Sequence, residues 1–278
     1  MKKISRRSFM AAAAVSVAAL AMTACGGSAS SVASSVASSA VSSEAVSSAA
    51  TAELTTVEAG KLTMATNAAF PPYEMTTDAG EFEGIDVDTA KAIAEKLGLE
   101  LQIDDMDFDA ALLSVQQGKA DIVMAGVTVT DERKAVMDFS DSYATGIQSI
   151  IVPNDSDIAS PDDLAGKTIG TQRGTTGYIY CSDDFGDENV VAYDDGLTAV
   201  QALNNGQVDA VVIDNAPAQE FVAANPGLKV LDTSYAEEDY AIGMAKGSAL
   251  EDAVNKALEE LKADGTLQAI VDKYINAN

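Results

Sequence analysis

The sequence predicts an α/β protein of two similar lobes, each with a central, mainly parallel sheet. From about residue 60, short strand-like runs alternate with amphipathic helical stretches, which is typical of βα units and parallel sheets. One stretch of this alternating region is then repeated later in the chain. The length of 278 residues allows one large domain or two of ordinary size, each with its own core.

The expected elements follow from hydrophobic periodicity. Helical spacing of Ala90, Ile93, Ala94 and Leu97 predicts a helix that ends before Gly98. The strand-like runs lie at 61–66, 99–103, 122–125, 148–152, 168–171, 190–193, 208–213 and 229–231. The C-terminal part is expected to be helical because apolar residues recur at helical spacing: Val254, Leu258, Leu261, Leu267, Ile270, Val271 and Tyr274.

The repeat favours two lobes over one continuous sheet, although a match of six positions could also be coincidence. Gln-Gln-Gly-Lys-Ala-Asp at 116–121 precedes Ile-Val-Met-Ala-Gly, and Asn-Asn-Gly-Gln-Val-Asp at 204–209 precedes Ala-Val-Val-Ile-Asp. Both copies are typical of a helix, a glycine C-cap and a buried strand. Ligands of open α/β sheets bind beyond the carboxyl ends of strands. We therefore expect Gly126 and Asp214, where the two strands end, to face each other across a cleft.

Composition excludes several function classes. The formal charge of −26, from 17 basic and 43 acidic residues, disfavours binding to nucleic acid and to anionic lipid. Without histidine, the chain has no Ser-His triad, no His-based acid–base catalysis and no His-ligated metal. No Gly-x-Ser-x-Gly, Ser-x-x-Lys or P-loop motif occurs. The acidic stretch at 105–109 lacks the glycine and glutamate of a calcium loop and is interpreted as a solvated helix start.

The first residues have the order of an export signal. A basic start is followed by an apolar run at 9–22 and then by Thr-Ala-Cys-Gly, which resembles a bacterial lipobox with Cys25 as the lipidated residue. A transmembrane anchor is the alternative, but this alanine-rich run is short for a membrane span. Ser-Arg-Arg-Ser-Phe-Met at 5–10 also matches a twin-arginine signal, so either export route stays open.

These features predict a signal peptide at 1–24 and a Ser/Ala-rich flexible tether at 25–57. The folded part is then expected at the extracytoplasmic face of a bacterial cell membrane, with contact to the membrane only through the N-terminal lipid anchor. Cys181 is the only thiol left beyond the tether, and we interpret it as structural.

Only two arginines, Arg133 and Arg173, lie beyond the basic start, and each could be an ordinary surface residue. Arg133 follows the predicted strand end at Gly126, and Gly-Thr-Thr-Gly at 174–177 forms a turn into a helix. An arginine fork and free helix N-terminal amides bind a carboxylate, whereas Asp214 suits an ammonium group. Together they predict a receptor for a free amino acid. Asp214 could instead be a helix N-cap.

The chain from about residue 60 to its end resembles the amino-acid-binding receptors of ABC importers, solute-binding protein family 3, which have the type II periplasmic-binding-protein fold. The motifs are individually weak but occur in order. They are Phe-Pro-Pro-Tyr-Glu at 70–74, Gly-Ile-Asp-Val-Asp-Thr-Ala at 84–90, Thr-Val-Thr-Asp-Glu-Arg at 128–133, Asp-Phe-Ser at 138–140, Gly-Thr-Thr at 174–176 and Val-Asp-Ala-Val-Val-Ile-Asp at 208–214.

The resemblance implies roles for the ligand's head group. Arg133 would hold the carboxylate with the backbone N–H groups of Thr128 and Thr176. Asp214, the carbonyl of Gly126 and the hydroxyl of Thr128 would hold the ammonium.

The resemblance also implies a side-chain compartment. Phe70 and Phe108 would sandwich the ligand's side chain, although each could instead be a core residue. Polarity would be tuned by Asn67, Tyr143 and Gln172, and Asn67 stands where some relatives carry an acid. Tyr73, Tyr143 and Arg173 are possible rim residues.

Two strands near 148–152 and 239–244 would form the hinge, with one lobe at 58–149 and 241–278 and the other at 150–240. The implied protein is a monomer without metal or cofactor that closes on its ligand and delivers it to the transmembrane subunits of an ABC permease. An enzyme of the same fold, such as a dehydratase, and an amino-acid sensor without transport are the alternatives. Glutamine, an arginine-like amino acid and cystine all remain open as ligands.

Overall fold

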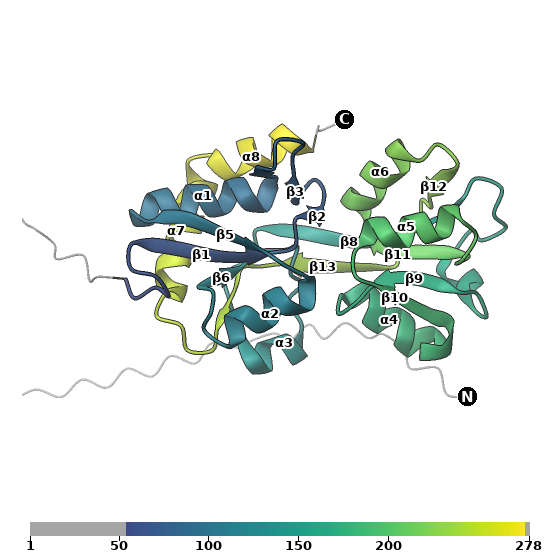
Figure 1. The fold of residues 1–278 in the computed structure, drawn as a ribbon, viewed down its shortest axis with the longest axis horizontal. Coiled ribbons are helices and arrows are strands. Elements are labelled where there is room, and N and C mark those ends of the chain that lie inside the picture. The colour runs from purple at the N-terminus through teal and green to yellow at the C-terminus, as the bar shows by residue number, and fades with distance from the viewer. Residues whose placement is uncertain (1–53, 276–278) are drawn as a thin grey trace, which may run out of the picture. The chain divides into compact units, whose positions relative to one another are not determined.

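The computed structural model describes residues 54–275. The predicted signal peptide, the lipidation site Cys25 and all of the tether except its last four residues lie outside this range. Within the described range, no helix is long and apolar enough to cross a membrane. Figure 1 shows two α/β lobes, each with helices on its sheet, and strands that run from one lobe toward the other.

The first lobe is built on a five-stranded sheet of order β5-β1-β6-β14-β7. Its strands are β1 (Lys61–Thr66), β5 (Glu100–Asp105), β6 (Ile122–Val123), β7 (Met137–Phe139) and β14 (Gly243–Ala245). Its helices are α1 (Ile85–Leu97), α2 (Phe108–Gln116), α3 (Asp131–Val136), α7 (Glu251–Ala263) and α8 (Thr266–Tyr274). A small sheet beside it contains β2 (Ala69–Phe70), β3 (Glu74–Thr76) and β4 (Phe82–Glu83).

The second lobe is built on a six-stranded sheet of order β10-β9-β11-β8-β12, with β13 also paired to β8. Its strands are β8 (Ala144–Pro153), β9 (Ile169–Gln172), β10 (Val190–Tyr193), β11 (Ala210–Asp214), β12 (Leu228–Val230) and β13 (Ala236–Tyr240). Its helices are α4 (Thr176–Phe185), α5 (Gly196–Asn204) and α6 (Asn215–Ala224), with short 3₁₀ turns at Pro161–Leu164 and Asp187–Asn189.

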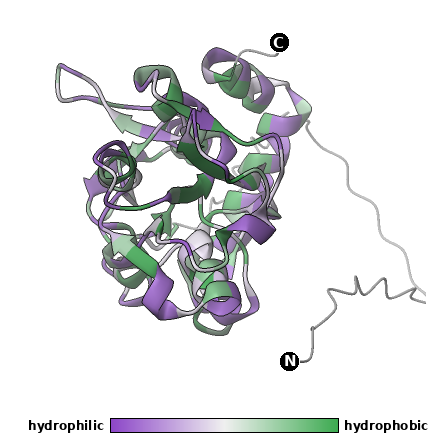
Figure 2. Cartoon of the chain, turned by 90° about the vertical axis from the view of Figure 1, so that its right-hand side faces the viewer, coloured by the Kyte–Doolittle hydropathy of each residue, from purple (hydrophilic) through white to green (hydrophobic). Residues whose placement is uncertain are grey.

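Apolar side chains cover both faces of each sheet. In β1, Met64 packs toward the α1 side, whereas its neighbour Ala65 packs toward α2, because successive strand residues point to opposite faces. Figure 2 shows the apolar strands in the interior and hydrophilic residues along the outer helix faces. Burial on both faces explains why these strands appear in the sequence as continuous apolar runs.

The two-lobe α/β prediction is confirmed, but both sheets are mixed rather than mainly parallel. Parallel pairing is limited to β5-β1-β6 in one lobe and to β10-β9-β11 in the other. β14 runs antiparallel to β6 and β7, and β8 runs antiparallel to β11, β12 and β13. β8 and β14 each follow a crossing from the other lobe, so they enter their sheets against the direction of the parallel strands.

The sequence repeat corresponds to a structural repeat. Each copy ends a helix, continues through a glycine with φ of 66° or 68°, and enters a strand of the parallel group. Asp121 then accepts the backbone N–H of Thr63 at 2.8 Å, and Asp209 accepts that of Thr168 at the same distance. The equivalent hydrogen bonds tie each copy to the neighbouring strand and support the interpretation of two similar lobes.

The chain passes between the two sheets twice. Sheet membership changes between Phe139 and Ala144 and again between Tyr240 and Gly243. The border expected between residues 149 and 150 falls inside β8, which pairs along its whole length with strands of the second lobe. Residues 144–149 therefore lie in the second sheet.

Gly84 provides a test of the packing that places the small sheet on α1. Its φ is 134°, and a Cβ at this position would overlap the Tyr73 carbonyl. We expect Gly84→Ala to lower the free energy of unfolding by roughly 2–4 kcal/mol, through backbone strain and overpacking. Gly80→Ala is the matched control because Gly80 also has positive φ, 81°, but open space around it. Urea denaturation showing equal losses for both variants would contradict the packing argument.

Candidate functional site

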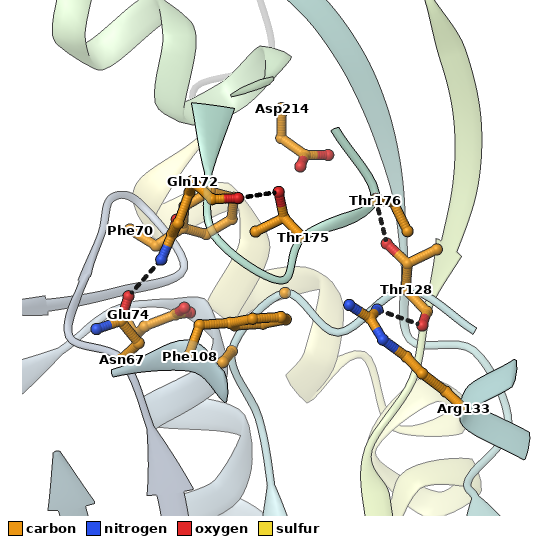
Figure 3. Close-up of a pocket in the computed structure, with 12 residues that line it drawn as sticks. Asn67, Phe70, Glu74, Phe108, Thr128, Arg133, Gln172, Thr175, Thr176 and Asp214 are labelled. Carbon is orange, nitrogen blue, oxygen red and sulfur yellow. Dashed lines mark hydrogen bonds between the residues drawn. The ribbon is translucent and has the colours of Figure 1, made fainter. Parts of the chain in front are cut away.

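A cavity lies between the lobes, where strands of both sheets end. It is lined by Asn67, Phe70, Glu74, Phe108, Ala125, Gly126, Thr128, Arg133, Gln172, Thr175, Thr176 and Asp214 (Figure 3). All nine residues that the sequence predicted for ligand binding are in this lining. The structure therefore brings them together, and their contact with a ligand stays a prediction.

Local backbone structure places two of these residues. Gly126 follows β6 with a φ of 55°, and a Cβ there would lie 2.8 Å from the Phe70 ring, so the turn needs glycine. The Gly126 N–H donates to the Asp86 carboxylate at 3.0 Å, which fixes the turn to α1. Arg133 lies in α3, whose N-cap Thr130 accepts the Arg133 N–H through its hydroxyl. The turn after β6 and the start of α3 together position Arg133 at the cavity.

Arg133 joins the two lobes in this conformation. Its side chain is only 9% exposed, and it donates to the carbonyl of Thr128 at 2.8 Å and to that of Gly174 at 3.1 Å. The guanidinium carbon also lies 5.3 Å from the centre of the Phe108 ring. Burial lowers the pKa of Arg133, but an arginine remains charged in a protein. Its positive charge therefore stays in the cavity wall.

Asp214 occupies the N-cap position of α6, but its side chain does not cap that helix. Instead its Oδ2 accepts from the Gln148 amide at 2.7 Å. Burial raises the pKa of Asp214 to about 7, with a further contribution from Glu238, while the Tyr240 hydroxyl and Gln148 oppose the shift. A nearby cation would oppose this shift by stabilising the carboxylate form.

Glu238 is a buried residue beside the cleft that the sequence analysis did not identify. Its Oε2 accepts from the hydroxyls of Thr128 at 3.2 Å and Thr176 at 2.9 Å, and from the Gln148 amide at 3.0 Å. Because both hydroxyl hydrogens can be taken by Glu238, the oxygen lone pairs of the threonines are available to a donor in the cavity. The sequence carries no signal for it, because Glu238 is the middle one of three consecutive acidic residues at 237–239.

Glu74 is the last residue of the Phe-Pro-Pro-Tyr-Glu motif at 70–74, and it was not predicted to contact the ligand. It is 0% exposed and lies against Asp86, which is also fully buried. Burial, together with Asp86, raises the pKa of Glu74 well above its usual range, and burial raises that of Asp86 to about 6. The two carboxyl groups are therefore expected to share a proton, with Glu74 as the neutral partner.

Asn67 and Gln172 form a direct bridge across the cleft. The Gln172 amide donates to Asn67 Oδ1 at 2.8 Å, and the Asn67 amide donates to the Met106 carbonyl at 3.0 Å. Both polar atoms of Asn67 thus have partners within the protein.

Two of the three possible rim residues lie elsewhere. Tyr73 is 4% exposed and stacks on Phe70 with ring centres 5.9 Å apart, while Tyr143 is 7% exposed and its hydroxyl lies beside Asp86. The rim expectation is wrong for both, because their rings are packed behind the cavity wall. Arg173 is half exposed at the outer edge, where it pairs with Asp194 at 3.4 Å.

Residues 54–275 contain neither a cluster of metal-binding side chains nor an exposed thiol. Residues 54–275 contain no group of three or more Cys, Asp or Glu side chains arranged to hold a metal ion. Cys181 is completely buried in the core of the second lobe, and burial raises its pKa to about 12. A buried thiol with a raised pKa is typical of a structural cysteine.

The model of the family "Bacterial extracellular solute-binding proteins, family 3" matches residues 62–277. The chain belongs to this family. Family 3 members are solute-binding proteins, so this membership favours binding over the enzyme alternative.

Curated relatives and a solved structure agree with the family assignment. The L-cystine-binding protein TcyJ of Escherichia coli (strain K12) is 33% identical over 225 residues, covering 80% of this chain and 85% of the relative. The arginine-binding extracellular protein ArtP of Bacillus subtilis (strain 168) is 34% identical over 224 residues, covering 77% of this chain and 86% of the relative. The arginine-, lysine-, histidine-binding protein ArtJ of Geobacillus stearothermophilus has a solved structure with 35% identity and a TM-score of 0.75, covering 78% and 96%. The type II periplasmic-binding-protein fold is thereby confirmed.

The buried acid Asp214 predicts that the ligand-free protein loses stability as pH rises. Its pKa is about 7 in the folded protein, above the 3.8 of a solvated aspartate, so the folded state holds more protons between these values. The free energy of unfolding should then fall from pH 4 to pH 7, by on the order of 2–4 kcal/mol for this residue.

Asp214→Asn should remove part of that fall, since asparagine does not titrate. The exposed Asp183→Asn serves as the matched control and should leave the pH profile unchanged. Denaturation at pH 5 and pH 8 measures the difference. A wild-type protein more stable at pH 8, or equal profiles for Asp214→Asn and wild type, would contradict the assignment.

Proposed function

We propose that the chain is an extracytoplasmic receptor that binds one free polar L-amino acid between its lobes and delivers it to the transmembrane subunits of an ABC importer. The observation that carries this function is the pair Arg133 and Asp214, two buried groups of opposite charge in the wall of one cavity. A free amino acid carries the complementary carboxylate and ammonium groups on a single carbon atom.

The head group would be held by parts of both lobes. Arg133 offers its remaining guanidinium N–H groups to the carboxylate, and the first turn of α4, at Thr176, adds backbone N–H groups. Asp214 and the Thr128 hydroxyl, turned by Glu238, would accept from the ammonium group. Phe70 and Phe108 in the cavity wall provide apolar surfaces for the ligand's side chain.

The names of the relatives support an arginine- or cystine-like ligand. The Escherichia coli relative is named for L-cystine, the Bacillus subtilis relative for arginine, and the Geobacillus stearothermophilus protein for arginine, lysine and histidine. Arginine, lysine and cystine share an extended side chain with polar groups at its far end, and histidine carries a polar ring. Asn67, Glu74 and Gln172 in the cavity wall would face such a side chain.

Closure would occur about the two crossings between the sheets, at 140–143 and 241–242. Hydrogen bonds from Arg133 to Gly174 and from Gln172 to Asn67 already connect the lobes. A ligand that contacts both lobes would favour the closed state by its higher affinity for that state. The importer would then recognise the closed form.

Anchoring would follow from the N-terminal sequence. Cleavage before Cys25 and lipidation of its thiol would place the folded part at the extracytoplasmic face of the membrane, on a Ser/Ala-rich tether. A monomer is sufficient for this arrangement because both sides of the cavity come from one chain.

Arg133→Ala should weaken amino-acid binding by about 100-fold or more, because the carboxylate loses its charged partner in a buried site. Arg173→Ala is the matched control, since Arg173 is half exposed and pairs only at the outer edge. It should change affinity by less than about 3-fold. Calorimetry with arginine, cystine and glutamine, together with thermal melting, makes the comparison. Retained affinity in a folded Arg133→Ala protein would place the carboxylate site elsewhere.

Cys25→Ser should release the protein from membranes, because serine has no thiol for lipidation. The same substitution at Cys181 should leave the protein in the membrane fraction, since that thiol is buried in the core. Fractionation of cells that express the full chain distinguishes the two variants. Cys25→Ser protein that stays with the membrane would show that another segment holds it there.

A further inference from the structure

Glu238 is a buried acid that lies outside the lining of the cavity. Its side chain is 7% exposed, whereas Glu237 and Asp239, its neighbours along the chain, are exposed on the other face of β13. Burying a carboxylate is unfavourable unless hydrogen-bond donors compensate for the lost water. The donors that surround Glu238 therefore indicate its role.

Three hydrogen bonds converge on one oxygen of Glu238. Its Oε2 accepts from the hydroxyls of Thr128 and Thr176 and from the amide of Gln148. The other oxygen, Oε1, has no hydrogen-bond partner among residues 54–275. Glu238 is therefore an acceptor for groups that lie between it and the cavity.

Backbone pairing holds Glu238 beside these groups. The segment 127–129 pairs in antiparallel orientation with residues 239–241, through N–H to carbonyl hydrogen bonds of 2.9 and 3.1 Å. Strand β13 in turn pairs with β8, the strand that carries Gln148. The position of Glu238 next to Thr128 and Gln148 is thus part of the scaffold.

Glu238 determines how the two threonine hydroxyls are oriented. Their oxygen atoms lie 3.5 Å apart, so one hydroxyl can donate to the other when no stronger acceptor is present. A carboxylate is the stronger acceptor, and Glu238 takes both hydrogens. Since a hydroxyl has one hydrogen and two lone pairs, Thr128 then presents only lone pairs to the cavity that it lines.

A site made only of acceptors distinguishes an ammonium group from a hydroxyl group. In the proposed head-group site, the ammonium faces the Asp214 carboxylate, the Gly126 carbonyl and the Thr128 hydroxyl. An ammonium group brings three N–H donors, one for each acceptor. A hydroxyl group in its place brings one donor, and its lone pairs would face the remaining acceptors.

We propose that Glu238 is a positioning residue that keeps hydrogen-bond donors out of the ammonium site, so that the cleft selects α-amino acids over α-hydroxy acids of the same shape. This inference rests on the proposed function because it concerns the head-group end of the same cavity. It does not depend on which amino acid binds, since all of them share this head group.

Glu238→Leu removes the acceptor and keeps a side chain of similar size, so the two hydroxyls turn to other partners. Glu238→Gln keeps an oxygen for the three donors and removes only the charge. Glu237→Leu is the matched control, because it makes the same change on the exposed face of the same strand.

Calorimetry on the full chain compares amino acids with their α-hydroxy counterparts. The pairs are arginine with argininic acid, glutamine with 2-hydroxyglutaramic acid, and cystine with 3,3′-dithiodilactic acid. The titrations are made at pH 8 because the pKa of Asp214 is about 7, and the protonated acid would itself be a donor.

The measured quantity is the ratio of the affinity for the amino acid to that for its hydroxy acid. Wild type and Glu237→Leu should show a ratio of at least about 100. The ratio of Glu238→Gln should stay within about 3-fold of wild type, whereas that of Glu238→Leu should fall by at least about 10-fold. A loss of folded protein lowers both apparent affinities alike and leaves the ratio unchanged.

Thr128→Val tests the orientation of the hydroxyl without a change at Glu238, and it applies even if Glu238→Leu fails to fold. Valine has nearly the shape of threonine but no hydroxyl. If the Thr128 hydroxyl only accepts, this variant should weaken amino-acid binding by about 10-fold and change hydroxy-acid binding by less than about 3-fold. Equal weakening of both ligands would overturn the proposal.

Three further results would overturn the positioning role. They are equal affinities of wild type for the two kinds of ligand, an unchanged ratio in folded Glu238→Leu, and a ratio in Glu238→Gln as low as that in Glu238→Leu. The last result would mean that the charge of Glu238 selects the ligand, and not the orientation of the hydroxyls. All three leave the proposed function intact, whereas a wild-type protein that binds no amino acid would overturn both.

Discussion

The cleft depends on charged groups that the fold buries without a partner of opposite sign. Arg133 is held by two carbonyl oxygens and an aromatic ring, and Asp214 by the amide of Gln148. Within residues 54–275, no ion pair joins these two groups to each other or to a third charge. Burying a charge without a partner raises the free energy of the folded protein. A ligand that carries both complementary charges would lower that free energy at both positions. Under the proposed function, ligand binding would therefore be coupled to closure of the lobes.

The scaffold keeps these groups apart by placing them on different lobes. Arg133 follows the end of β6 in the first lobe, and Asp214 ends the equivalent strand β11 in the second lobe. The glycine turn before each strand has a similar φ, and the aspartate after each turn accepts an equivalent backbone hydrogen bond. Both strands are therefore attached to the neighbouring strand of their own sheet in the same way. Because the strands end at the same cleft, a group on one lobe contacts the other lobe only when the lobes come together.

Many of the site residues could be predicted because strand ends and short motifs are local features. Gly126 and Asp214 follow from the repeat, and Arg133 follows seven residues after Gly126. Glu238 could not be placed in the same way. Its partners Thr128, Thr176 and Gln148 are 110, 62 and 90 residues away, and no local pattern joins them. Tyr73 and Tyr143 were expected at the rim, but the packing of their rings behind Phe70 and Asp86 is a tertiary feature.

The sequence by itself determined the alternation of strands and helices, the repeat, the acidic composition and the motifs that carry the family resemblance. These depend on side-chain chemistry and on spacing along a single element, both of which can be read without a fold. The tertiary structure decided the antiparallel entry of β8 and β14, the burial of Glu74 and Glu238, and the choice of hydrogen-bond partners for each buried carboxyl group. The protonation of a carboxyl group depends on how much water reaches it and on which charges surround it. Both are set by segments far apart in the chain, so only the folded protein shows that burial raises the pKa values of Asp214 and Glu74.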